Sequence, residues 1–67
     1  MDMEQRIDAI RKKARTHRVP MWSIAKKIGV SESSITRWMR YELTPERFDL
    51  MNTAIDEILK ERNEANV

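Results

Sequence analysis

Five polar side chains fall close together in the middle of the chain at intervals of three and four residues, so on a helix they would share one face. They are Glu32, Ser33, Thr36, Arg37 and Arg40. An arginine can donate to two acceptors on one guanine edge, and short polar side chains let a helix approach such an edge closely. The set suits recognition by hydrogen bonding rather than bond-making chemistry.

Each of these residues also has a simpler alternative. Arg37 and Arg40 contact base edges, contact only phosphate, or are solvated charges, and base contact is favoured more for Arg37 than for Arg40. Thr36 can place its methyl group against that of thymine. Glu32 either accepts a hydrogen bond from cytosine or only stabilises the helix N-terminus, and the second is preferred because phosphates would repel a carboxylate.

The sequence predicts two short helices on either side of Gly29, and the polar set lies on the second. Glycine takes the left-handed conformation that ends a helix without a Cβ clash, and Gly29 is the only glycine in the chain. Ser31 is a suitable N-cap for the helix that follows. Apolar residues at helical spacing would form the buried faces: Met21, Ile24, Ala25 and Ile28 before the turn, and Ile35, Trp38 and Met39 after it.

This segment resembles the helix-turn-helix of the lambda-repressor and Cro-like superfamily, also called the XRE type. The residues that carry the resemblance are Ile24-Ala25, Ile28-Gly29-Val30-Ser31, Ile35 and Trp38. It covers residues 21–40 and extends loosely to about residue 59, with Trp38 bulkier than the aliphatic residue usual there. The alternative is a helical hairpin in another kind of small all-α domain. The resemblance implies a phage or mobile-element DNA-binding regulator, with repression favoured.

The resemblance also implies roles for the helix before the turn. In this motif that helix crosses the DNA backbone, so Lys26 and Lys27 are expected to contact phosphate. Trp22 lies off the apolar face and either packs against the first helix or lies along the sugar-phosphate backbone. Ser31 is expected at the DNA interface as well as at the cap.

Length and composition exclude several other classes of protein. Sixty-seven residues allow one domain, and the absence of cysteine removes disulfides and favours a reducing compartment. A single histidine cannot build a metal site, and no apolar run approaches the roughly 20 residues that span a bilayer. The acidic start, Met-Asp-Met-Glu, does not suit a signal peptide. We therefore expect a cytoplasmic protein that is not an enzyme, with no cofactor, metal, membrane contact or small-molecule ligand.

Four helices are expected, which makes the chain an all-α, compact four-helix domain over residues 1–62. The first runs from about Asp2 to Thr16, and the second starts at Pro20 or Met21. The third covers about 32–40 and carries the polar face. The fourth follows the start signal Thr44-Pro45-Glu46 and ends near Arg62, leaving 63–67 as a frayed tail.

Charge is unevenly distributed along the chain. Residues 1–40 carry ten basic and four acidic side chains, a net charge of +6, whereas residues 41–67 carry three basic and seven acidic ones, a net charge of −4. This asymmetry would turn the N-terminal half toward a polyanion. The basic run at residues 11–18 is either an extra phosphate-binding patch or simply the basic end of a helix, as the helix dipole favours.

The fourth helix is more apolar than a four-helix core requires, and we expect the excess to cover a second copy of the chain. The expected dimer seam consists of Phe48, Met51, Ile55, Ile58 and Leu59, while Leu43 and Leu50 are expected in the core. In the alternative, half of this face covers the core and the rest stays partly exposed. The leading function is thus a homodimeric reader of double-stranded DNA, and the competing one is an interaction module that binds a protein through this helix.

Overall fold

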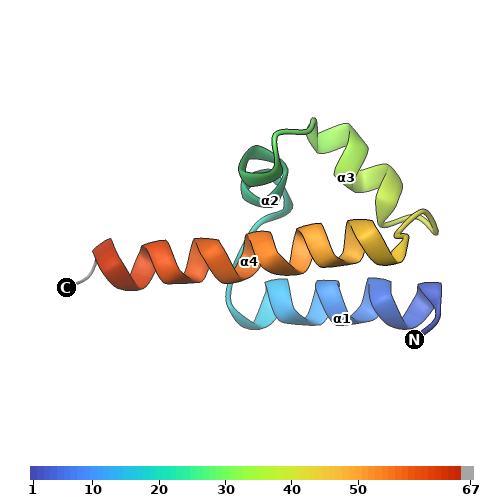
Figure 1. Cartoon of the computed structure of the whole chain (residues 1–67), viewed down its shortest axis with the longest axis horizontal. Coiled ribbons are helices and arrows are strands. Elements are labelled where there is room, and N and C mark those ends of the chain that lie inside the picture. Colours follow the sequence, from blue (N-terminus) through green and yellow to red (C-terminus); the bar gives the residue numbers. More distant parts are fainter. Residues whose placement is uncertain (66–67) are drawn as a thin grey trace.

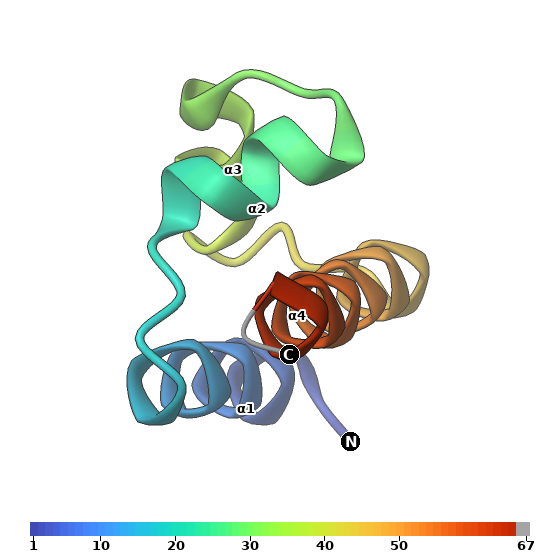
Figure 2. The same cartoon turned by 90° about the vertical axis from the view of Figure 1, so that its left-hand side faces the viewer.

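In the computed structural model, which describes residues 1–65, four helices follow one another: α1 (Met3–Thr16), α2 (Met21–Ile28), α3 (Glu32–Trp38) and α4 (Pro45–Ala65). No strand occurs within this part of the chain, so the all-α, four-helix prediction is confirmed. The long helix α4 runs beside α1 in the same direction, while α2 and α3 lie together above them (Figures 1 and 2). None of these helices combines the length and apolar character needed to cross a membrane.

Local capping contacts set where the helices begin. At the start of α1, the Asp2 carboxylate accepts a hydrogen bond from the Gln5 backbone N–H (2.8 Å), and the Gln5 amide oxygen accepts one from the Asp2 N–H (3.0 Å). This reciprocal pair satisfies two backbone donors that a helix otherwise leaves exposed. Pro20 is extended and precedes α2, so of the two predicted starts, Pro20 and Met21, the helix begins at Met21.

The turn between α2 and α3 depends on Gly29. Its φ of 91° lies in the left-handed region, where its N–H donates to the Ala25 carbonyl. The Val30 N–H donates to the same carbonyl over 3.0 Å, which closes the end of α2. Because Ala25 itself is 97% buried (3% exposed), its small side chain lets the two helices cross closely at this turn.

The core draws on every helix and on the connection before α4. Its largest fully buried side chains are Ile10, Ile24, Ile35, Leu43, Met51 and Ile55. Leu43, which lies between α3 and α4, is held in place from outside, since Arg6 of α1 donates to its carbonyl over 2.7 Å. The two faces predicted for α2 and α3 therefore both reach this core, with Trp38 at its edge.

Three predictions about α3 and α4 are wrong in detail. The helical part of α3 ends at Trp38, with Met39 as C-cap, instead of reaching residue 40. Helix α4 continues through Asn63, Glu64 and Ala65, past the expected end at Arg62, so the predicted frayed tail is helical up to Ala65. The remainder of that tail lies outside the described residues.

The expected orientation of α4 is also wrong at several positions. Met51 and Ile55, expected at a dimer seam, are completely buried, and Phe48, Ile58 and Leu59 are partly buried and pack on the same core. The reason is that this stripe faces α1 and α2 rather than solvent. Leu50, expected in the core, is instead 50% exposed.

Replacing Gly29 with Ala should lower the free energy of unfolding by about 1–2 kcal/mol, the cost of a left-handed conformation for a residue with a Cβ. An added Cβ would meet no atom within 4 Å, so backbone strain is the whole effect. Gly29→Asn is the matched control, because asparagine tolerates this conformation better, and it should cost clearly less. Urea unfolding measures both, and equal midpoints for Ala and Asn would contradict this account of the turn.

Candidate nucleic-acid interface

The outward face of α3 forms a shallow, open recess. All five polar residues identified from the sequence line it: Glu32, Ser33, Thr36, Arg37 and Arg40. On the opposite side of the same helix, Ile35 is fully buried and Trp38 is 8% exposed. A helix of seven residues thus separates a core face from a face on which every side chain can donate or accept a hydrogen bond.

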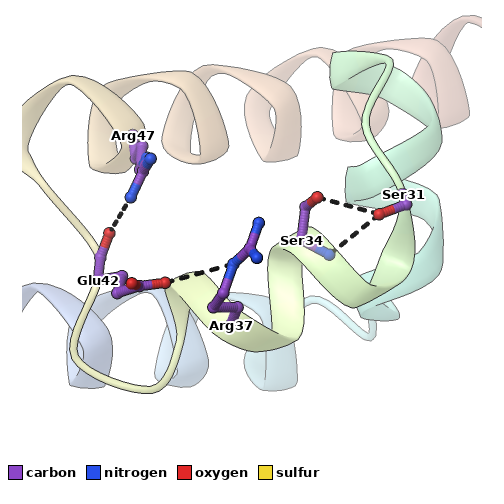
Figure 3. Close-up of polar contacts among 5 residues, drawn as sticks. All are labelled: Ser31, Ser34, Arg37, Glu42 and Arg47. Carbon is purple, nitrogen blue, oxygen red and sulfur yellow. Dashed lines mark hydrogen bonds and ion pairs between the residues drawn. The ribbon is translucent and has the colours of Figure 1, made fainter.

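Two hydroxyl groups near this face already have partners within the chain. The Ser31 Oγ caps α3 by accepting from the Ser34 N–H (3.1 Å) and also lies 3.0 Å from the Ser34 hydroxyl (Figure 3). The Thr36 hydroxyl donates to the Glu32 carbonyl over 3.1 Å. Ser31 is therefore first of all a capping residue, and the Thr36 hydroxyl can donate to a ligand only by giving up that bond, although its oxygen can still accept one.

Arg37 does not extend freely into solvent. Its Nε lies 3.4 Å from a carboxylate oxygen of Glu42, in the connection after α3, and both side chains remain substantially exposed (Figure 3). An exposed pair of this kind is worth at most about 1 kcal/mol, so an incoming anion can replace Glu42. No pattern in the sequence indicates this role of Glu42, because the pair forms only after the chain has turned at the end of α3.

Trp38 and Arg47 help to hold that connection. The Arg47 guanidinium lies 5.0 Å from the centroid of the Trp38 ring, within the range of a cation–π contact, and donates to the Glu42 carbonyl over 2.9 Å (Figure 3). The chain reverses at Tyr41, whose φ of 71° is left-handed. The bulky Trp38 thus gives Arg47 a surface to lie on, and Arg47 fixes the backbone that presents Glu42 to Arg37.

The two lysines of α2 have different surroundings. Lys27 pairs with Glu61 and lies 3.8 Å from Glu57, both on α4. The hydrogen bond to Glu61 raises the pKa of Lys27 above its ordinary 10.5, against a smaller opposing effect of desolvation. Lys26 is exposed and forms no ion pair with any residue between 1 and 65. The expected phosphate contact therefore suits Lys26, while Lys27 joins α2 to α4.

The remaining predicted contact on α2, Trp22, is 57% exposed. It is not part of the buried core. An indole at this level of exposure, at the start of α2, presents a flat surface with one N–H donor to solvent.

The basic run of α1 divides between two uses. Lys13 donates to Asp56 (2.6 Å) and Asn52 (2.7 Å) of α4, so it fastens α1 to α4. Arg11 borders a recess shared with Thr36 of α3 and with Arg40 just after it, and its only ion pair within residues 1–65 is a long one of 3.8 Å to Asp8. Arg11 thus extends the basic surface of α3, which the sequence alone left undecided.

The arrangement can form directed noncovalent contacts with an anionic, hydrogen-bonding surface. Its outward groups are guanidinium, hydroxyl and carboxylate groups on a helix narrow enough to enter a groove. Among residues 1–65, no three histidine, cysteine or acidic side chains gather where they could hold a metal ion. No protein-family model, curated protein or solved structure matches the chain.

Replacing Lys27 with Gln should lower the urea midpoint, whereas Lys26→Gln, one position away and outside these ion pairs, should leave it unchanged. Because the pKa of Lys27 is raised in the folded state, its contribution is fully present below pH 10.5 and is lost as the pH rises through the folded-state value. The difference between the two variants should also shrink in 1 M salt, because the Debye length there is only about 3 Å and exposed ion pairs are screened. Equal effects of both variants at neutral pH and low salt would refute the assignment.

Proposed function

We propose that this protein is a sequence-specific regulator of transcription that binds double-stranded DNA by inserting α3 in the major groove. The observation that carries the proposal is a recess lined by five polar side chains, four on the outward face of a short helix whose other face is buried and the fifth, Arg40, just after its end. The major groove of B-DNA, about 12 Å wide, admits one helix and displays acceptors and donors in a pattern unique to each base pair. A-form RNA offers no equivalent groove.

The distribution of charge supports the same orientation. Arg11, Arg37 and Arg40 make the surface around α3 positively charged, whereas α4 carries most of the acids of the C-terminal half. A polyanion attracts the first and repels the second, so the molecule would approach DNA with α3 in front. Phosphate contacts then fix its position, and base contacts give sequence preference.

Within this proposal the residues have distinct tasks. Arg37 reads a base edge after exchanging Glu42 for a DNA acceptor, which makes Glu42 a competitor of DNA for Arg37. Arg40, Arg11 and Lys26 contact phosphate, and the Trp22 indole lies along the backbone. Lys27 is not included among the DNA contacts, because it is paired with two glutamates of α4. Competition by Glu42 would weaken contacts to any phosphate more than a well-formed bidentate contact to guanine, and so favour specific sites.

The proposed biological setting is repression of transcription in a bacterium or its phage. A DNA-binding domain that occupies the groove near a promoter excludes other proteins, so repression is the favoured outcome. A chain without cysteine is suited to the reducing cytoplasm, where bacterial and phage DNA is found. The resemblance of residues 21–40 to phage repressors supports the same setting.

We further propose that two copies bind one two-fold symmetric site. A seven-residue recognition helix makes few base contacts, and joining two half-sites about 34 Å apart multiplies their affinities. This part of the proposal no longer depends on the expected seam, since Met51 and Ile55 belong to the core of each copy. The two copies would therefore meet on DNA rather than through a preformed α4 interface.

A duplex selected from a random pool should be bound with an affinity that falls steeply with salt, with a log–log slope on the order of −4 to −5 for about five phosphate contacts.

Arg37→Ala should cost about 1–3 kcal/mol on that duplex and relax the preference at one base pair. Glu42→Gln should increase affinity for unrelated duplexes up to about fivefold, the equivalent of about 1 kcal/mol. Fluorescence anisotropy measures all three effects.

Lys60→Ala is the matched control, since it removes an exposed positive charge from α4, away from the recess. It should leave the preferred duplex bound almost as tightly as before. The proposal fails if no duplex is bound at about 50 mM salt, where phosphate contacts are strong. Equal losses for Arg37→Ala on selected and unrelated duplexes would make Arg37 a phosphate contact instead.

Sedimentation should show a monomer in free solution and two copies on the selected duplex. Halving the palindrome should leave one copy bound and reduce affinity by a factor on the order of 10² to 10⁴. A single copy on the full site, or an affinity unchanged by halving the site, would remove the two-copy arrangement and leave single-site binding intact.

A further inference from the structure

A second surface feature lies between α2 and the first half of α4. It is an open groove whose apolar part includes Ile28 and Leu50, and whose rim carries Glu46, Asp49 and Glu57. Leu50 is 50% exposed, although its neighbour Met51 is completely buried. Of the large apolar residues on α4, Leu50 is the one that the fold leaves in solvent.

The groove carries more negative than positive charge. Three carboxylates face one ammonium group, that of Lys27, and this lysine is already engaged by Glu57 and by Glu61. Glu46 and Asp49 form no ion pair with any other described residue. An exposed leucine is therefore flanked on one helix face by two carboxylates without a countercharge.

This charge pattern decides among the candidate occupants. A second copy docked by two-fold symmetry would bring the Glu46, Asp49 and Glu57 of each copy against those of the other around Leu50, and repulsion opposes such a contact. A nucleic acid is excluded by its own negative charge. A protein helix that presents an apolar side chain between lysines or arginines satisfies both the leucine and the carboxylates.

We propose that this groove is a docking site for a basic amphipathic helix of a partner protein. The apolar side chain of the partner packs on Leu50 and Ile28, and its cationic side chains pair with Glu46 and Asp49. The groove shares no lining residue with the recess on α3, so both can be occupied in one complex. The inference goes beyond DNA binding and does not depend on it.

A titration of the ¹⁵N-labelled protein with three synthetic helical peptides tests the proposal. The first has a leucine stripe flanked by lysines, the second has glutamates in place of the lysines, and the third has the composition of the first in an order that breaks the stripe. We expect saturable shifts of amide signals at Lys27, Ile28 and residues 46–57 with the first peptide alone, and weaker binding as salt rises.

Variants locate the contact. Leu50→Ser should weaken binding of the first peptide about five- to tenfold, as for a central interface residue, with the urea midpoint retained because the side chain is half exposed. Glu46→Gln should weaken it less and reduce the salt dependence. Glu64→Gln, which removes an exposed carboxylate from the last turns of the same helix, is the matched control and should bind as the unmodified protein does.

Three results would overturn the proposal. Equal binding of the ordered and scrambled lysine peptides would show attraction by charge without a docking site, and unchanged binding by Leu50→Ser would place the contact elsewhere. Concentration-dependent shifts of the groove signals without peptide, abolished by Leu50→Ser, would assign the groove to a second copy. Because Leu50→Ser should bind DNA normally, failure here and failure of DNA binding are distinguishable.

Discussion

The fold depends on burying the apolar faces of two very short helices. Helices of eight and seven residues are not stable alone, so α2 and α3 persist only because Ile24 and Ile35 are completely buried against the rest of the chain. The left-handed Gly29 and the small Ala25 allow the two helices to cross closely enough for both to reach that core. The outward face of α3 is a consequence of this packing, since the buried side determines which side is left for a ligand.

Basic residues in this protein serve two purposes, which the net charge alone does not separate. Arg6, Lys13, Lys27 and Arg62 hold the elements together, through the carbonyl of Leu43, the α4 carboxylates and the carbonyls of His17 and Arg18. Within residues 1–40, Lys13 and Lys27 are paired with carboxylates of α4, so the charge of +6 in this part of the chain overstates what an external polyanion would meet. Around α3 the outward cations are Arg11, Arg37 and Arg40, and even there Arg37 is shared with Glu42.

The two surface features have opposite chemical character on opposite elements. The recess on α3 is lined mainly by cationic and hydroxyl groups, whereas the groove between α2 and α4 combines an exposed leucine with uncompensated carboxylates. Helix α2 takes part in both halves of the molecule, since it carries Lys26 on its exposed side and Lys27 and Ile28 toward α4. A regulator with this arrangement would hold DNA and a basic protein segment at once, without either covering the other.

The sequence by itself determined the features that depend on neighbours within about one helical turn. The four helices, the cap at Ser31, the turn at Gly29 and the polar face of α3 all follow from spacing and from local hydrogen bonds. Only the tertiary structure decided which side of α4 is buried, because adjacent aliphatic residues such as Leu50 and Met51 satisfy the same pattern until α1 and α2 cover one of them. The same holds for the ion pairs of Lys27, whose partners lie 30 and 34 positions away (57 − 27 and 61 − 27) and become neighbours only when the chain folds.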